Sequence, residues 1–219
     1  MQFIYFPNPS AQITITGNEH KYLFKVRRIK KNETVKIRNL TDDYLYVYKI
    51  DSINKKEAVL SLIEKKLSPN KPGKFFHLAW CVIEPKNIEK AIPSLNEIGV
   101  GKITFVYCDY SQKNFKLKPE RIEKILINSC QQCGRSNIPE IEIINSSYEF
   151  FKKYSEFYAL DFDGKKIECD FYANKPFLIG PEGGFSEKER KFFKNKFKLK
   201  GFILRSETAA ISICSKILL

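Results

Sequence analysis

The sequence predicts a two-part α/β protein, in which a small β-barrel precedes a parallel sheet covered by helices. Three observations predict this class. Residues 1–67 contain short runs that alternate between apolar and polar side chains. Residues 68–73, Ser-Pro-Asn-Lys-Pro-Gly, are all turn formers. After them, candidate strands alternate with candidate helices, as in a parallel sheet. We therefore expect one domain over residues 1–69 and a second over 70–219.

The first segment is predicted to be mainly β-structure. Its strand candidates either alternate with period two or are rich in Tyr, Val and Ile. Thr41–Asp43 supplies a turn, and one helix is expected over Glu19–Arg28. Several short strands with one helix favour a small barrel. The expected strands are Gln12–Thr16, Val35–Arg38, Leu45–Ile50 and Ala58–Ile63.

The second segment is predicted to contain six strands and five helices. Gly99 and Gly134 are expected to end the first two helices, since glycine is favoured just past a helix C-terminus. Ser146 with Glu149, and Ser186 with Glu189, have the spacing of helix-capping boxes. The two helices that end at these glycines are expected over Asn87–Ile98 and Glu120–Cys133, and the last helix is expected over Glu207–Leu218. The expected strands are Phe75–Ile83, Ile103–Cys108, Glu140–Ile144, Phe157–Phe162, Pro176–Gly180 and Phe202–Arg205.

Three loops are predicted to meet at one rim of the parallel sheet. They are Asp161–Gly164, Gly180–Gly184 and Leu204–Thr208, each placed directly after or at the end of a candidate strand. Open α/β sheets bind ligands at the carboxyl ends of their strands. The glycine-rich loop matches neither the dinucleotide fingerprint nor a P-loop, and it carries the carboxylate of Glu182. A neutral or cationic ligand fits it better than a triphosphate, although a tight turn without a ligand would have the same sequence.

Four arginines are candidates for contact with substrate, and each also has a structural explanation. Arg205 stands beside Glu207, so it either acts at the rim or forms an ion pair. Arg135 follows the helix stop at Gly134, where it either takes a phosphate or base edge or is solvated. Arg27 and Arg28 end the first predicted helix, as solvated charges or as part of an RNA-binding surface.

The net charge of the chain favours a polyanionic partner. The formal net charge is +13 at pH 7, and the sequence pI is about 9.4. Such a charge attracts RNA, DNA or an anionic membrane surface. Only seven of the 38 basic residues are arginines, so a compositional bias of the genome would also explain the excess of lysine.

The cysteines and histidines argue against a metal site or a hydrolase. Cys130 and Cys133 have zinc-ligand spacing, but no second pair accompanies them. His20 and His77 stand alone, and no G-x-S-x-G sequence is present. The chain shows no signal peptide and no apolar run of roughly 18 residues. We therefore expect a cytoplasmic protein with six reduced thiols, no metal and no membrane partner.

Five motifs resemble those of one family. Leu178–Ser186 is similar to the IGPEGG(F/L)S signature of RsmE-type methyltransferases, which belong to the SPOUT superfamily. Ile203–Ala210 is similar to the family's ILR(T/S)ETA signature, and Gln132–Glu140 to its G-R-x-x-(V/I)-P-E element. Glu97–Val100 and Phe24–Arg28 resemble its ELGV and V-L-R stretches. The motifs occur in the family's order and cover nearly the whole chain.

The resemblance implies a fold, a reaction and a set of partners. The fold is a PUA-like RNA-binding barrel followed by a SPOUT domain with a deep C-terminal trefoil knot, usually in a homodimer. The reaction is methylation by S-adenosylmethionine of N3 of a uridine in 16S rRNA of the assembled small ribosomal subunit.

The resemblance also implies roles for individual residues. Arg205 and Arg135 would be catalytic, because a positioned arginine stabilises the charge that spreads onto the uracil oxygens when N3 loses its proton. RNA would be contacted by Arg27, Arg28, Arg135 and Asn137. The cofactor would be bound by Leu160, Leu178, Ile179, Gly180, Pro181, Glu182, Gly183, Gly184, Leu204, Arg205, Ser206, Glu207, Thr208 and Ala209.

The chain departs from the family pattern in two places. Ser94–Gly99 stands where K-A-T-E-L-G is frequent, and the preceding Pro93 would disturb a helix interior. Lys200–Phe202 stands where L-G-P-R is usual, which affects RNA contacts more than the cofactor loops. Two alternatives are a SPOUT enzyme that methylates ribose 2′-hydroxyls and a non-catalytic RNA-binding factor of ribosome assembly. The first would make a ribose-methylated nucleoside, and the second would bind RNA without binding S-adenosylmethionine.

Overall fold

The computed structural model of the protein describes residues 2–167 and 174–219. The chain divides into two compact units. The N-terminal unit comprises the residues up to Lys71 together with Cys130–Ile138, and the C-terminal unit comprises Pro72–Ser129 and Pro139–Leu219.

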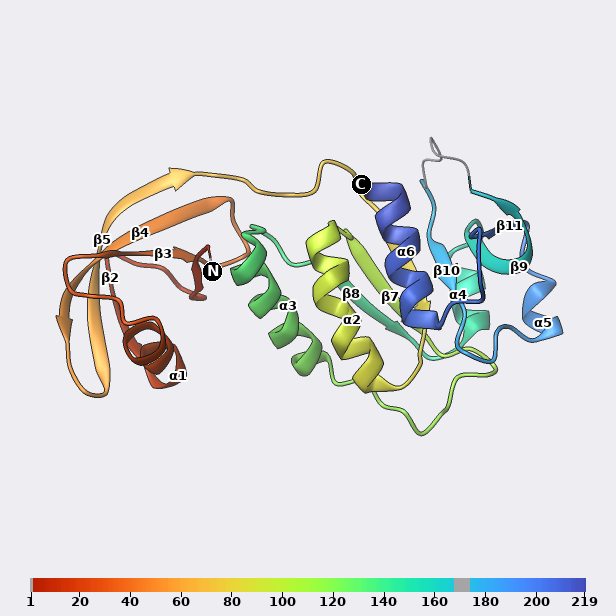
Figure 1. Cartoon of the computed structure of the whole chain (residues 1–219), viewed down its shortest axis with the longest axis horizontal. Helices are drawn as coiled ribbons and strands as arrows, with labels where there is room; N and C mark the ends of the chain where they lie inside the picture. The colour runs from red at the N-terminus through yellow and green to blue at the C-terminus, as the bar shows by residue number, and fades with distance from the viewer. Residues whose placement is uncertain (1, 168–173) are drawn as a thin grey trace. The chain divides into compact units, whose positions relative to one another are not determined.

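The N-terminal unit is a curled five-stranded sheet with a buried apolar face. The strand order is β1-β3-β4-β5-β2, with β1 parallel to β3 and all other neighbours antiparallel. The long pair β4–β5, drawn in orange in Figure 1, changes register twice, and such bulges bend a sheet. Ile13, Ile37 and Leu60 lie in the enclosed core. The strands are β1 (Ile4–Tyr5), β2 (Gln12–Thr16), β3 (Thr34–Arg38), β4 (Tyr44–Ile53) and β5 (Glu57–Leu67).

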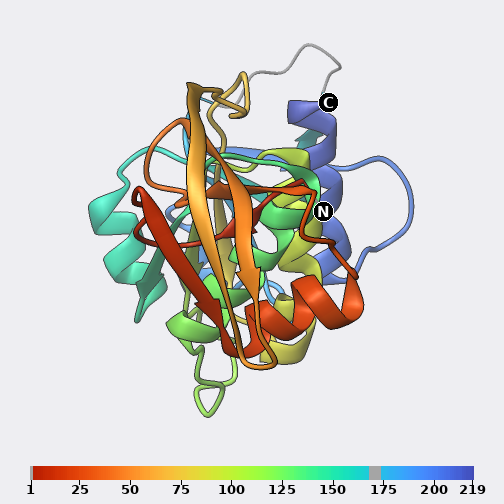
Figure 2. The same cartoon turned by 90° about the vertical axis from the view of Figure 1, so that its left-hand side faces the viewer.

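The four strands predicted for this segment are confirmed, and β1 was missed because two residues carry no periodicity. The predicted helix over Glu19–Arg28 is wrong in type and bounds. A single α-turn, α1 (Gly17–His20), leads into a π-helix over Lys21–Val26, and both lie beside the curled strands in Figure 2. An α-helix places a residue inward every three to four positions and a π-helix every four to five. Over six residues with one buried residue, Leu23, the sequence pattern does not distinguish the two.

The C-terminal unit is built on a six-stranded sheet in which all neighbours are parallel. The strand order is β11-β9-β10-β6-β7-β8. The strands are β6 (His77–Cys81), β7 (Lys102–Val106), β8 (Glu140–Ile144), β9 (Tyr158–Lys166), β10 (Phe177–Ile179) and β11 (Asn195–Lys198). The helices are α2 (Pro85–Ile98), α3 (Pro119–Cys133), α4 (Ser147–Lys153), α5 (Glu187–Arg190) and α6 (Ser206–Leu218).

Helices cover both faces of this sheet. All five residues of the central strand β6 are buried, as expected of a strand inside a parallel sheet. Ala79 and Cys81 face a core that includes Phe150 of α4. Trp80 points to the other face, where it bonds to the first residue of α6. On that face α2 and α6 lie side by side (Figure 1).

Most helix ends lie where local signals predicted them. Gly99 ends α2 with φ +106°, a left-handed conformation that glycine adopts without strain. The Ser186–Glu189 capping box is complete, and the Ser146 hydroxyl accepts the Glu149 backbone N–H. Pro93 does not interrupt α2. The neighbouring Ile92 and Leu95 are fully buried, so tertiary packing holds the helix despite the missing backbone donor.

Two strand predictions near the C-terminus are corrected by the structure. Phe202–Arg205 is not a strand, and the strand in this region is β11, which ends at Lys198. Phe202 and Ile203 are 96% and 81% exposed, so their apolar character reflects a surface loop and not a buried strand. Asp161–Gly164 is not a loop but part of β9, which continues to Lys166 beside β11.

The expectation of reduced thiols is also corrected. Cys81 at the end of β6 forms a disulfide with Cys108 after β7, with an S–S distance of 2.08 Å. The two strands are neighbours in the sheet, so their ends lie close together, which the spacing of 27 residues did not reveal. Among the described cysteines, Cys130, Cys133 and Cys214 are free thiols, and Cys169 lies outside the described residues.

Within residues 2–167 and 174–219, no helix is long and apolar enough to cross a membrane. The same residues contain no group of three His, Cys, Asp or Glu side chains arranged to hold a metal ion.

Candidate functional site

A pocket lies beside the middle of β9 and the carboxyl end of β10 in the C-terminal unit. It brings together the three segments that the sequence placed at one rim, and the space inside it, part of which is open to solvent, amounts to about 940 Å³. The lining residues are Leu160, Asp161, Phe162, Ile179, Gly180, Pro181, Glu182, Gly184, Phe185, Lys198, Leu199, Gly201, Phe202, Ile203, Leu204, Ser206 and Ala209.

The register of the sheet explains why two of these segments meet. Leu178 of β10 pairs in parallel with Ala159 of β9, so the residues that follow them reach the same rim. Those residues are Ile179 and Leu160, and both line the pocket. The convergence therefore follows from parallel neighbours, as the sequence analysis predicted.

A buried hydrogen-bond chain fixes the third segment against the glycine-rich loop. The indole Nε1 of Trp80 donates to the Ser206 hydroxyl at 2.9 Å, and that hydroxyl donates to the Gly180 carbonyl at 2.6 Å. Trp80 and Ser206 are 0% and 5% exposed, so water does not compete for these bonds. The first turn of α6 is thereby held beside the pocket.

The acidic side chain on the β9 wall is compensated by an arginine. Arg190 donates from Nε and Nη2 to the two oxygens of Asp161, at 2.7 and 3.1 Å, and from Nη1 to the Phe185 carbonyl at 2.8 Å. The hydrogen bond to Asp161 is the main cause that raises the pKa of Arg190. The Arg190 guanidinium thus joins the end of the glycine-rich loop to β9 through these hydrogen bonds. Glu182, by contrast, is an exposed carboxylate at the pocket.

The glycine-rich loop turns sharply before α5. Gly184 has φ +71°, which an L-residue with a side chain rarely adopts, and its N–H donates to the Pro181 carbonyl at 2.9 Å. The turn ends in the capping box of Ser186 and Glu189, whose carboxylate is fully buried. Local backbone requirements therefore account for part of the glycine signature.

Most of the residues expected at the cofactor lie at the pocket. Its lining includes Leu160, Ile179, Gly180, Pro181, Glu182, Gly184, Leu204, Ser206 and Ala209. Five others do not line it: Leu178 is buried in the core, Gly183 abuts Tyr110, and Arg205, Glu207 and Thr208 flank the lining residues of α6. Phe202 and Ile203 were missed because the sequence analysis assigned them to a strand.

Arg205 stands at the N-terminus of α6, between two pocket residues. It is the N-cap residue, with an extended backbone and an exposed side chain. Within the described residues it forms no ion pair, so the structural explanation with Glu207 is not found.

Arg135 belongs to the N-terminal unit and is 5% exposed. Its Nε donates to the side-chain oxygen of Asn137 at 3.2 Å. Burial lowers the pKa of Arg135, against the opposing effect of Cys130 and Cys133. It does not line the pocket of the C-terminal unit, so its catalytic role and the RNA contacts of both residues stay predictions.

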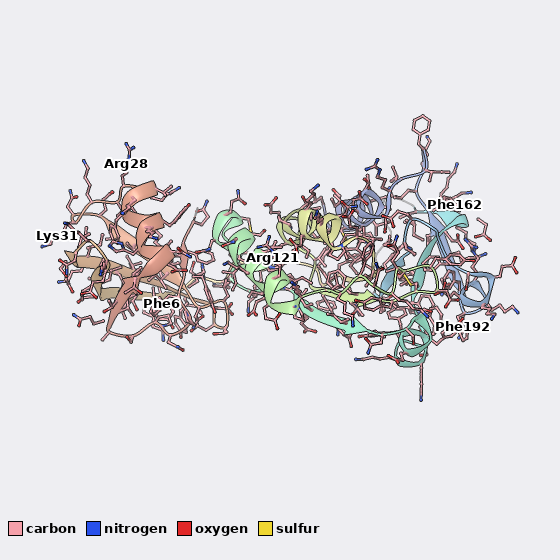
Figure 3. All side chains as sticks on the ribbon, turned by 90° about the horizontal axis from the view of Figure 1, so that it is seen from below. Phe6, Arg28, Lys31, Arg121, Phe162 and Phe192 are labelled. Carbon is pink, nitrogen blue, oxygen red and sulfur yellow. A yellow bond between two sulfur atoms is a disulfide. The ribbon has the colours of Figure 1, made fainter. Side chains whose placement is uncertain are left out.

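The exposed end of the π-helix is strongly basic. Arg27 and Arg28 are exposed, and Figure 3 shows the Arg28 side chain extending away from the ribbon. Lys25, Lys30 and Lys31 are exposed as well. The arrangement suits contact with a phosphate backbone, and the individual RNA contacts stay predictions.

Comparison with known proteins gives a consistent result. A model of the RNA methyltransferase domain family matches residues 70–218, and a model of the RNA methyltransferase PUA domain matches residues 15–63. Two Helicobacter pylori proteins named ribosomal RNA small subunit methyltransferase E are each 40% identical over 222 residues, with 98% of both chains covered. A relative of the same name from Buchnera aphidicola is 31% identical and covers 95% of this chain.

Solved structures agree with the sequence matches. A protein from Legionella pneumophila, described as a methyltransferase in complex with bound SAM, superposes with a TM-score of 0.80 at 25% identity, over 98% of this chain and 95% of that one. A Neisseria gonorrhoeae ribosomal RNA small subunit methyltransferase E superposes with a TM-score of 0.82 at 21% identity, over the same shares, which shows the fold alone. The resemblance seen in the five motifs is thus confirmed, and the chain belongs to the ribosomal RNA small subunit methyltransferase E family.

Proposed function

We propose that this rRNA methyltransferase transfers the methyl group of S-adenosylmethionine to N3 of a uridine in 16S rRNA of the assembled small ribosomal subunit. The observation that carries the proposal is the pocket at the rim of β9 and β10, built from the two family signatures. The Legionella and Neisseria structures contain S-adenosylmethionine, and relatives at 40% identity carry the small-subunit name.

The residues of the pocket fit this cofactor. Ile179, Leu204 and Ile203 offer apolar surface suited to an adenine ring, and the glycine-rich loop offers backbone groups. The Asp161 charge is compensated by Arg190, while the exposed carboxylate of Glu182 suits a cationic ligand. When bound, S-adenosylmethionine supplies an electrophilic methyl group on a sulfonium. We propose that Leu178, Gly183, Arg205, Glu207, Thr208 and the lining residues predicted from the motifs hold it.

Arg205 is the residue that we assign to the reacting base. Loss of the N3 proton spreads negative charge over the two uracil carbonyl oxygens, and a guanidinium stabilises that charge as it develops. The exposed side chain of Arg205, beside pocket residues Leu204 and Ser206, supports this assignment. Positioning and charge stabilisation would then account for most of the rate enhancement. Arg135 is proposed as a second catalytic arginine.

We also infer the finer architecture of the family, with a PUA-like barrel over residues 1–69 and a knotted SPOUT domain over 70–219 that forms a homodimer. The knot is supported by the path of the chain, since α6 follows the edge strand β11 and packs against central strands β6 and β10. The exposed apolar residues Phe202 and Ile203 at the pocket mouth support a dimer. Light scattering of the purified protein tests the dimer.

Nucleoside mass spectrometry tests the reaction. Small ribosomal subunits that lack the modification are incubated with the purified protein and S-adenosylmethionine, and free 16S rRNA is treated in parallel. We expect 3-methyluridine in the subunit sample. Equal product from free rRNA would overturn the requirement for the assembled subunit. A ribose-methylated nucleoside would overturn base methylation, and no product together with no cofactor binding in calorimetry would overturn the function.

A further inference from the structure

Tyr110 is an exposed aromatic residue on a turn that is otherwise held in place. The turn Cys108–Ser111 follows β7 at the same carboxyl rim as the pocket, since all strands of the sheet are parallel. Tyr110 is 56% exposed, whereas Cys108 and Ser111 are 3% and 5% exposed. The Tyr110 ring is therefore exposed to solvent, while the residues on either end of its turn are buried.

The turn is anchored to the residues that end the glycine-rich loop. The Asp109 carboxylate accepts from the Ser186 hydroxyl at 2.5 Å and from the Tyr148 hydroxyl at 3.2 Å. The Asp109 N–H donates to Glu189 Oε1 at 3.0 Å. Ser186 and Glu189 are the capping box of α5, so the turn and the glycine-rich loop share one anchor.

Two further bonds stiffen the turn itself. The Ser111 hydroxyl accepts the Cys108 N–H at 3.1 Å, and the Ser111 N–H donates to the Cys108 carbonyl at 3.0 Å. The disulfide joins Cys108 to Cys81 on the neighbouring strand. An aromatic ring on such a rigid turn loses little conformational freedom when a ligand contacts it.

The Tyr110 side chain packs against Gly183 of the glycine-rich loop. A Cβ added at Gly183 would lie 3.3 Å from the Tyr110 Cβ and 3.6 Å from its ring atom Cδ2. At Gly184, the nearest atom would be Nη2 of Arg190 at 3.7 Å. Gly184 and Glu182, on either side of Gly183, line the pocket.

From this geometry we propose that Tyr110 is a substrate-positioning residue whose ring stacks on the target base beside the cofactor loop. The assignment rests on the proposed function. The N3 atom of uridine lies on the pairing edge of the base, so an enzyme reaches it by taking the base out of its stack. A base removed from its neighbours loses its stacking partners, and proteins replace them with aromatic side chains. Tyr110 offers such a surface at the rim where the methyl group is transferred.

The test compares two substitutions of Tyr110 with one control, using the full-length protein, unmethylated small subunits and S-adenosylmethionine. Tyr110→Leu removes the ring, and Tyr110→Phe keeps it. Phe75→Leu is the control, because Phe75 is 59% exposed and lies just before β6, at the amino ends of the strands and away from the carboxyl rim. Steady-state kinetics give kcat and KM for the subunit, and calorimetry gives the Kd for S-adenosylmethionine.

We expect Tyr110→Leu to lower kcat/KM for the subunit roughly tenfold or more, as the loss of one stacked base does. Tyr110→Phe and Phe75→Leu should stay within about threefold of the wild type, and the Kd of the cofactor should not change. Unreduced kcat/KM in Tyr110→Leu would overturn the assignment, and so would an equal loss in Tyr110→Phe. A weakened cofactor Kd in Tyr110→Leu would overturn it in favour of a structural role. If the wild type makes no methylated uridine, the proposed function fails first and the assignment with it.

Discussion

Glu142 is the centre of a polar network in the C-terminal unit. Its carboxylate accepts from the Thr104 hydroxyl at 2.8 Å and the Tyr154 hydroxyl at 2.7 Å, and it pairs with Lys102 and Lys153. Burial alone would raise the pKa of Glu142, but the hydrogen bonds from Lys153, Tyr154 and Thr104 outweigh it and lower the pKa to about 2. The carboxylate thus stays charged over the physiological range.

His77 joins the same network in its neutral form. Its Nε2 lies 2.7 Å from the Thr104 hydroxyl, and the side chain is 8% exposed. Burial, with a smaller effect from Lys102, lowers the pKa of His77 to about 4. Below the pKa of about 6.5 in the unfolded chain, the unfolded state binds a proton that the folded state excludes. Stability therefore falls as the pH drops from 6.5 toward 4.

This linkage predicts a specific pH dependence of stability. Between pH 7 and pH 5, His77 should lower the free energy of unfolding by roughly 2 kcal/mol. His77→Gln keeps a polar partner for Thr104 but does not titrate, so its free energy of unfolding should fall less over this interval. Urea denaturation at pH 5, 6 and 7 measures both proteins. Parallel pH profiles of the two would contradict the assignment.

Arg205 provides the second prediction at this scale. Arg205→Ala should lower kcat on small subunits by about 10²–10³-fold, the usual cost of removing one charge-stabilising group. The Kd for S-adenosylmethionine should stay within about threefold, because the Arg205 side chain is exposed and does not line the pocket. Arg205 would then hold the cofactor through its backbone, which alanine keeps. Arg121→Ala is the matched control, since Arg121, labelled in Figure 3, is exposed on α3. Among the described residues its one ion pair is with Glu89. Turnover by Arg205→Ala at the rate of this control would refute the role.

At the scale of elements, the site depends on how closely β11 approaches β9. A Cβ at Gly164 of β9 would overlap the backbone of Phe197 in β11. The register of the two strands shifts between Lys196 and Phe197, close to that contact. Since Lys198 and Leu199 line the pocket directly after this pairing, the strand pair positions one wall of the site.

Gly164→Ala should therefore weaken both the fold and the cofactor site. Backbone atoms cannot move aside as a flexible side chain can, so we expect a loss of about 2–3 kcal/mol in the free energy of unfolding, the usual cost of overpacking. The Kd for S-adenosylmethionine should rise as well. Gly73→Ala is the control, because nothing lies within 4 Å of a Cβ at that glycine. Chemical denaturation and calorimetry compare the two variants, and equal stability would show that β11 does not pack as described.

At the scale of the whole molecule, the dominant feature is the excess of positive charge. The formal net charge of +13 includes exposed arginines and lysines at the end of the π-helix. Contacts with RNA phosphates release counterions, whereas binding of a small cofactor in a pocket does not. The two affinities should therefore respond differently to salt.

Raising monovalent salt from 50 to 200 mM should weaken binding to 16S rRNA on the order of a hundredfold, as expected for several phosphate contacts. The Kd for S-adenosylmethionine should change less than about threefold. Fluorescence anisotropy with labelled rRNA fragments and calorimetry with the cofactor measure the two responses. Arg28→Ala should reduce the slope of log K against log salt by about one unit if Arg28 contacts a phosphate. An unchanged slope would remove Arg28 from the RNA-binding surface.

The sequence by itself determined the features that depend on local periodicity and backbone chemistry. Alternating residues predicted β2 and β3, and richness in Tyr, Val and Ile predicted β4 and β5. Glycine and capping signals predicted the end of α2 and the start of α5. The loop Gly180–Gly184 was predicted at the rim because it follows a strand of a parallel sheet, and the structure places it at the pocket. Leu204 and Ser206 also line the pocket, although no strand ends directly before them. The two signature motifs predicted the family, which the 40% identical relatives confirm.

Only the tertiary structure decided which distant residues touch. Trp80 lies 126 positions from Ser206, and Asp109 lies 77 positions from Ser186, so no local pattern joins either pair. The apolar run Phe202–Leu204 was predicted as part of a strand, Phe202–Arg205. In the structure β11 forms the edge of the sheet, and the apolar run lies exposed at the pocket. No sequence pattern singled out Tyr110, because its contact with Gly183 joins residues that are distant in the chain. The spacing of apolar residues along the sequence shows which face of a strand or helix is buried. The order of the strands in the sheet decides which residues pack against that face.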